Sequence, residues 1–168
     1  MKFFKLFSFI FLCLFSDIDP EINQASTPTT VAQTQTLTID SIQWGKIIVN
    51  TSSDSQAKFK DCICTPQGAK AWDWGITGMS HNPGIGIAEV KDLVDQTDVF
   101  VLSRGVDLVL QVQPAVVDYL KKAGKTVMVA RTINKPDYDI TVPGTAVYEY
   151  NKLVQEGKRV VGLFHSTC

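Results

Sequence analysis

The chain has 168 residues, of which 45% are hydrophobic and 20% charged, and this balance is typical of one globular domain of roughly 100–200 residues. Sixteen Lys and Arg residues against 17 Asp and Glu give a formal net charge of −1. Without an overall basic field, we expect no nucleic-acid partner and no stable membrane association. The four Cys residues are too few for a disulfide framework.

The first sixteen residues have the layout of a secretory signal peptide, because two lysines precede an apolar run that ends at Phe15. This run is shorter than the about 20 apolar residues that a membrane-spanning helix needs. Residues 17–40 are rich in Ser, Thr, Gln and Pro, which predicts a disordered linker. The folded domain is then predicted over residues 41–168.

The first part of this domain reads as a β-layer. A strand over 42–49, broken at Gly45, is predicted to pair with a strand over 57–64, because residues 50–55 have the composition of a hairpin turn. A second turn is predicted at 65–68. The aromatic segment at 71–74 alternates Trp72 with Trp74, so we expect one ring to face the core and the other to line a surface groove.

The second part alternates helices with strands. Helical spacing of apolar residues predicts helices over 87–96, from Pro114 to the stop at Gly124, and over 147–154. Continuous apolar runs predict strands at 99–102, 126–130 and 160–164. The fold class is therefore α/β, with parallel strand pairs, helix-covered faces and an N-terminal hairpin layer.

Two segments suggest ligand binding. Gly84-Ile85-Gly86 precedes a helix, but Glu89 stands where the dinucleotide fingerprint needs Gly, so a turn that starts the helix is the better interpretation. Arg104 and Gly105 follow a buried strand, at the end where open α/β sheets place ligands. Arg104 can either bind a carboxylate or phosphate there or pair with a structural carboxylate such as Asp107.

One zinc-type set can be assembled on paper, from Cys62, Cys64, His165 and Cys168. The C-x-C spacing is unlike the usual knuckle, and buried thiols are the commoner explanation. We therefore expect no metal and no cofactor. We also expect no catalytic residue, because a Cys168 nucleophile with His165 as its base is the weaker interpretation of these two side chains.

A set of residues spread over the predicted domain carries a family resemblance. These are KDC at 60–62, WDW at 72–74, TG at 77–78, His81, Pro83 and Gly84, Arg104 and Gly105, YLKK at 119–122, YN at 150–151 and FHSTC at 164–168. In this order they resemble the Mth938-like domain family. The resemblance implies a single three-layer domain, with a central mixed sheet that has helices on one side and an N-terminal β-layer on the other.

The resemblance also bears on function. Members include a mitochondrial assembly factor for respiratory complex I and a vertebrate protein associated with fat-cell differentiation, which implies an interaction or regulatory role in the cytoplasm. Three features depart from the family pattern: Ser103 stands where relatives commonly have Gly, Cys64 has no expected counterpart, and residues 133–144 read as an inserted surface loop.

Two functional hypotheses follow. The first is a noncatalytic interaction or regulatory protein, not an enzyme, with a protein partner of unknown identity. The alternative is a small-molecule (anion) binding protein or enzyme with a pocket formed by Trp74, His81, Arg104 and Gly105. The family resemblance implies a cytoplasmic location, whereas residues 1–16 favour secretion as the alternative.

Overall fold

The computed structural model describes residues 37–52 and 54–168. The predicted leader, 1–16, and most of the predicted linker, 17–40, lie outside these residues. The end of that linker range is nevertheless part of the domain, because Leu37 and Ile39 are buried and the first strand begins at Thr38. Within the described residues, no helix is long and apolar enough to cross a membrane.

The N-terminal layer is an antiparallel sheet of three strands, β1 (Thr38–Gln43), β2 (Lys46–Ser52) and β3 (Ser55–Phe59). The prediction of one strand broken at Gly45 is wrong, since β1 and β2 form a hairpin in which Gly45 takes a φ of 73°. Glycine adopts this left-handed conformation without steric cost, so the chain reverses there. The predicted partner strand over 57–64 is also divided, because β3 ends at Phe59 and Cys62 begins a strand of a different sheet.

The central layer is a five-stranded mixed sheet in the order β5-β4-β8-β6-β7. Strand β6 is parallel to both β7 and β8, and β4 is antiparallel to β8 and β5. Every residue of β6 and β8 is buried, as their continuous apolar runs predict. The strands are β4 (Cys62–Thr65), β5 (Gly68–Ala71), β6 (Val99–Ser103), β7 (Thr126–Ala130) and β8 (Val160–Phe164).

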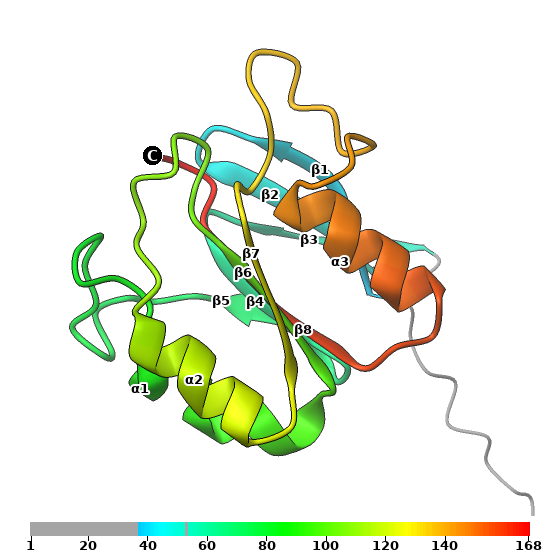
Figure 1. Cartoon of the computed structure of the whole chain (residues 1–168). Helices are drawn as coiled ribbons and strands as arrows, with labels where there is room; N and C mark the ends of the chain where they lie inside the picture. The colour runs from blue at the N-terminus through cyan, green and yellow to red at the C-terminus, as the bar shows by residue number, and fades with distance from the viewer. Residues whose placement is uncertain (1–36, 53) are drawn as a thin grey trace, which may run out of the picture. The chain divides into compact units, whose positions relative to one another are not determined.

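Helices cover both faces of the central sheet (Figure 1). One face carries α1 (Ile87–Val90), which continues as the 3-10 helix η1 (Lys91–Gln96), together with α2 (Pro114–Lys122). The other face carries the N-terminal sheet, and α3 (Ala146–Gln155) packs beside it. The predicted α/β three-layer fold with a mixed central sheet is therefore confirmed, with α3 sharing the face of the N-terminal sheet.

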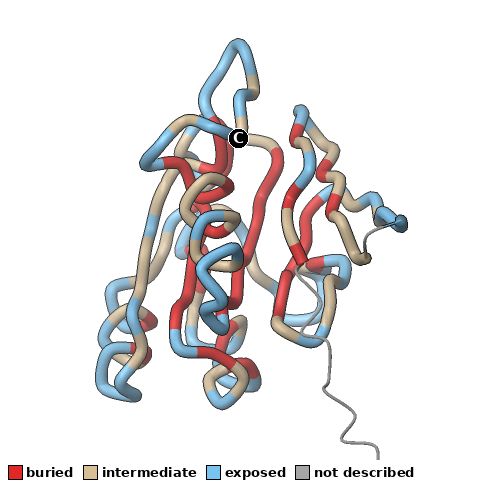
Figure 2. Tube along the Cα trace, turned by 90° about the vertical axis from the view of Figure 1, so that its right-hand side faces the viewer, coloured by how far each residue is buried: buried red, intermediate tan, exposed pale blue. Residues whose placement is uncertain are grey.

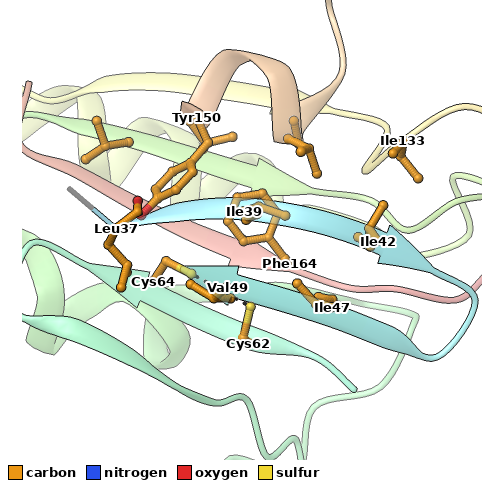
Figure 3. Close-up of a cluster of buried hydrophobic side chains, with 14 of the residues drawn as sticks. Leu37, Ile39, Ile42, Ile47, Val49, Cys62, Cys64, Ile133, Tyr150 and Phe164 are labelled. Carbon is orange, nitrogen blue, oxygen red and sulfur yellow. Dashed lines mark hydrogen bonds between the residues drawn. The ribbon is translucent and has the colours of Figure 1, made fainter. Parts of the chain in front are cut away.

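Strand alternation divides the interior into two cores, one on each face of the central sheet. On β6, Val101 points toward the N-terminal sheet, into what we call the first core. Phe100 and Leu102 point toward α1 and α2, into the second core. Figure 2 shows the buried strands running through the interior between exposed outer segments. Figure 3 shows the first core, in which Tyr150 and Phe164 pack between the two sheets, with ring centroids 5.2 Å apart.

The segment 133–144 only partly matches the predicted surface loop. Its middle residues are exposed, but Ile133 is completely buried, and Tyr138 and Ile140 pack against the first core. Lys135 Nζ lies 3.0 Å from Asp107 and 4.4 Å from the centre of the Trp44 ring. The segment therefore covers one end of the first core and contacts the turn between β1 and β2.

Replacing Asn151 tests the attachment of α3 to the N-terminal sheet. The Asn151 amide accepts from the Ile39 N–H at 2.8 Å and donates to the Ile39 carbonyl at 2.8 Å. Asn151→Ala removes both bonds and is expected to lower the free energy of unfolding by about 1–3 kcal/mol in urea titrations. The exposed neighbour provides the control, since Lys152→Ala is expected to stay within about 0.5 kcal/mol of the parent. Equal effects of the two substitutions would contradict this role for Asn151.

Candidate functional site

A cleft of about 600 Å³ opens where the chain leaves the end of β8. Three aromatic rings gather in it: the Trp74 ring centre lies 5.0 Å from that of His81 and 4.6 Å from that of His165. The lining residues come from the segments around β4, β5 and β8 and from the loop before α1; they are Lys60, Asp61, Ala71, Trp72, Asp73, Trp74, Gly75, His81, His165 and Thr167.

Two imidazoles and a thiol meet at one end of this cleft. His81 Nε2 lies 3.3 Å from His165 Nε2 and 3.3 Å from Cys168 Sγ. The potential ligand atoms of the three residues all lie within 4.8 Å of one another. We call these three residues the His-His-Cys cluster.

Contacts to three residues hold His165 in place. Its side chain is 3% exposed, and its Nδ1 lies 3.1 Å from Asp61 Oδ1. The backbone N–H of His165 donates to Ser103 Oγ at 2.8 Å, and its carbonyl accepts from Thr132 Oγ1 at 2.7 Å. Ser103, at the end of β6, is thus the hydroxyl that anchors this histidine.

Burial and neighbouring polar groups shift the pKa values of Asp61 and His81 in the cleft. Burial raises the pKa of Asp61, but hydrogen bonds from His165 and from the Ser166 N–H outweigh it and bring the pKa below its usual value. The Asp61 carboxylate therefore stays charged beside the His165 ring, with Oδ1 3.1 Å from Nδ1. Burial and the neighbouring His165 lower the pKa of His81, which favours its neutral form near pH 7.

His81 is positioned by the loop that follows Arg104. The His81 carbonyl accepts from the Gln111 N–H at 2.9 Å, and the Gln111 carbonyl accepts from the Ile85 N–H at 2.9 Å. Gly84, with a φ of +82°, packs so closely on the Gln111 backbone that a Cβ atom has no room. The Gly84-Ile85-Gly86 segment is therefore a docking turn before α1, which confirms the expectation of a turn that starts the helix.

The same loop positions Cys168. Gly105 has a φ of +81°, and a Cβ atom there would collide with the backbone of Cys168. The Val106 N–H donates to the Thr167 carbonyl at 2.6 Å. Gly105, which the sequence suggested as a ligand-binding residue, instead makes room for the segment that carries the thiol.

Arg104 lies outside the cleft, contrary to the pocket expected from the sequence. Its Nε donates to the Leu110 carbonyl at 3.1 Å, and one terminal nitrogen donates to the Leu108 carbonyl at 2.9 Å and to Gln111 Oε1 at 3.2 Å. The structural partner expected for it, Asp107, pairs with Lys135. Arg104 is thus a positioning residue that holds the loop on which both His81 and Cys168 rest.

The two tryptophans behave as their alternation predicts. Trp72 is buried against the second core and donates through Nε1 to Glu89 at 2.8 Å. Trp74 is half-buried and lines the cleft. Its Nε1 is buried and has no hydrogen-bond partner among the described residues, and an unpaired buried donor of this kind is rare in a folded protein.

The zinc set assembled from the sequence does not form. Strand alternation places Cys62 and Cys64 on the side of β4 that faces the first core (Figure 3). Their sulfur atoms lie 3.8 Å apart. Hydrogen bonding with Cys64 and burial raise the pKa of Cys62 well above its usual value, which keeps this thiol protonated. The buried-thiol interpretation is confirmed, and His81 takes the place of these two cysteines beside His165 and Cys168.

Comparison with known proteins assigns the family. A family model described as "protein of unknown function (DUF498/DUF598)" matches residues 39–165. The chain belongs to this family. The match extends from β1 to His165 and so contains the whole fold and most of the cleft.

Solved structures show the same fold as this DUF498/DUF598 member. A protein from Bordetella parapertussis is 20% identical with a TM-score of 0.56, and 80% of this chain and 98% of that chain are covered. The conserved hypothetical protein PH1505 from Pyrococcus horikoshii is 21% identical with a TM-score of 0.54, covering 77% and 98%. The protein MT938 is 16% identical with a TM-score of 0.52, covering 79% and 99%. The Mth938-like resemblance is thereby confirmed for the fold.

Asp61→Asn tests the charged state of the Asp61–His165 pair. Because the folded-state pKa of Asp61 is lowered, its charge stabilises the protein above the unfolded-state pKa of about 3.9, and this contribution is lost as pH falls through the folded-state pKa. We expect Asp61→Asn to cost about 1–3 kcal/mol at pH 7. In paired urea titrations the difference from the parent should shrink toward pH 3. A difference that is the same at both pH values would contradict the charged pair.

Proposed function

We propose that this domain is a noncatalytic binding protein with an interaction or regulatory role, and that the cleft around Trp74 is its recognition site. One observation carries the proposal: Trp74 lines an open cleft, and its buried Nε1 lacks an acceptor among the described residues. A buried donor left unpaired costs free energy that a bound acceptor recovers. Sites of this kind combine an apolar, aromatic wall with a few placed polar groups.

Family resemblance supports a more specific proposal. The WDW segment at 72–74, His81 and the FHSTC segment at 164–168 resemble the adipogenesis-associated Mth938-domain protein, and these residues form the cleft described above. We therefore propose a role in cell differentiation or in an assembly process, in the cytoplasm, through a protein partner. Residues 1–16 support secretion as the alternative location.

The rim of the cleft suits a protein partner. Ile76 is 82% exposed in the turn that follows Trp74, where its N–H donates to the Asp73 carbonyl at 3.4 Å. The next turn is closed by the Met79 N–H, which donates to the Trp74 carbonyl at 3.0 Å. A rigid aromatic anchor beside an exposed aliphatic side chain resembles the centre of a protein interface.

Ile76→Asp tests this interface without disturbing the core, because the side chain is almost fully exposed. Tagged protein should capture partners from native lysate that the Ile76→Asp protein loses, while both proteins unfold at the same temperature. Val129→Asp is the matched control, since Val129 is 42% exposed on β7, outside the cleft. Retention of every captured protein by Ile76→Asp, or equal loss with Val129→Asp, would contradict the proposed interface.

The unpaired indole also favours a second candidate, a small-molecule binding protein or enzyme that uses the cleft itself. Lys60 lines it together with Asp61 and Asp73, so a zwitterion fits this wall better than a simple anion. Arg104 takes no part, because it lies outside this cleft and its Nε and one terminal nitrogen bind the loop after it.

Trp74→Phe separates this candidate from the first, because it keeps an aromatic ring but removes the N–H donor. A zwitterionic or carboxylate ligand at 100 times its Kd should stabilise the parent by about 2.7 kcal/mol in thermal unfolding. The same ligand should stabilise Trp74→Phe markedly less. Absence of any shift across a set of amino acids and carboxylates would argue against a small-molecule ligand, and an equal shift in the variant would contradict recognition by the Trp74 N–H.

A further inference from the structure

We propose that the His-His-Cys cluster is a zinc site in which His81 Nε2, His165 Nε2 and Cys168 Sγ are the three protein ligands. This inference concerns one end of the cleft and does not depend on a protein partner or a small-molecule ligand.

Two of the three separations among these atoms match tetrahedral zinc. Two nitrogens, each 2.0–2.1 Å from zinc at a tetrahedral angle, lie about 3.3 Å apart, and a nitrogen and a thiolate sulfur lie about 3.5 Å apart. The observed separations are 3.3 Å for the nitrogen pair and 3.3 Å between His81 Nε2 and Cys168 Sγ. The ligand atoms of all three residues lie within 4.8 Å of one another, so an ion fits among them once the His165 and Cys168 side chains move closer together.

The surroundings of His165 are those of a metal ligand. Metal-bound histidines almost always donate their other ring N–H to a carboxylate or carbonyl, which orients the ring and increases its basicity. Asp61 Oδ1 lies 3.1 Å from Nδ1 without the geometry of a hydrogen bond, so a small rotation of the ring on metal binding completes this contact; Asp61 is itself held by the Ser166 N–H at 2.8 Å. The Thr167 hydroxyl, 3.1 Å from His165 Nε2, is the competing hydrogen-bond partner of the same nitrogen.

The other two ligands are held by the backbone of a single loop. The Gln111 N–H binds the His81 carbonyl, and Gly105 and Val106 pack against the segment 167–168. Such prior positioning reduces the ordering that metal binding has to impose. Zinc binding displaces the proton of the Cys168 thiol to solvent.

The donor set selects the class of ion. Calcium and magnesium prefer oxygen ligands, whereas imidazole nitrogen and thiolate sulfur suit zinc. Three protein ligands leave one tetrahedral position for water or a bound group, unlike structural zinc sites, in which four protein ligands close the coordination. The site is therefore expected to bind one Zn²⁺ per chain.

Zinc titration of the full chain, stripped with chelator and kept reduced, tests the proposal. Calorimetry with Zn²⁺ alone should give one site, and Co²⁺ should give the absorption of a tetrahedral thiolate complex. Cys168→Ser and His81→Asn should each weaken zinc binding by more than the about 10-fold to 100-fold expected for Asp61→Asn, a change in the outer shell. Cys168→Ser should also remove the thiolate charge-transfer band of the Co²⁺ complex.

The controls separate this site from other causes of zinc binding. Cys64→Ala removes a thiol in the first core and should leave the stoichiometry and affinity unchanged, as should Ile76→Asp, which tests only the partner surface. The unfolding temperature without zinc establishes that each variant is folded. No stoichiometric zinc, or zinc binding that is unaffected by both Cys168→Ser and His81→Asn, would overturn the proposal. Copper binding without a tetrahedral Co²⁺ spectrum would overturn the assignment to zinc.

Discussion

The position of β8 between β4 and β6 is the constraint on which the rest of this structure depends. Its pairing with both neighbours buries every residue of the strand, so the chain leaves the sheet at one defined point. Beyond that point, Asp61, Ser103 and Thr132 hold His165 through three separate polar contacts. Each partner comes from a different part of the chain, and buried polar contacts of this kind make a unique geometry.

The elements of this fold were predictable where local patterns agree with tertiary packing. The buried runs of β6 and β8, the Pro114 start of α2 and the helical face of α3 all follow from residue spacing. The N-terminal β-layer was harder, because periodicity does not distinguish a broken strand from a tight hairpin at Gly45. Nor does it show that the chain changes sheets between Phe59 and Cys62.

The site was only partly predictable, because its members are brought together by register rather than by sequence spacing. The sequence pointed to Trp74, His81, His165 and Cys168, and these side chains do meet. It also pointed to Cys62 and Cys64, which strand alternation turns to the opposite face. Cys62 pairs with Phe164 in the sheet and shares its face, whereas His165 follows on the other side. That parity is visible only once the β4–β8 pairing is known.

The loop from Arg104 to Gln113 positions two of the three residues of the His-His-Cys cluster. Asp61 directly precedes β4 and His165 directly follows β8, two neighbouring strands in the interior of the central sheet, so their positions are fixed with the core. His81 and Cys168 rest on the loop through backbone contacts to Gln111, Gly105 and Val106. The positions of one imidazole and of the thiol therefore depend on the conformation of a single loop, whereas the second imidazole is fixed by separate contacts to Asp61, Ser103 and Thr132.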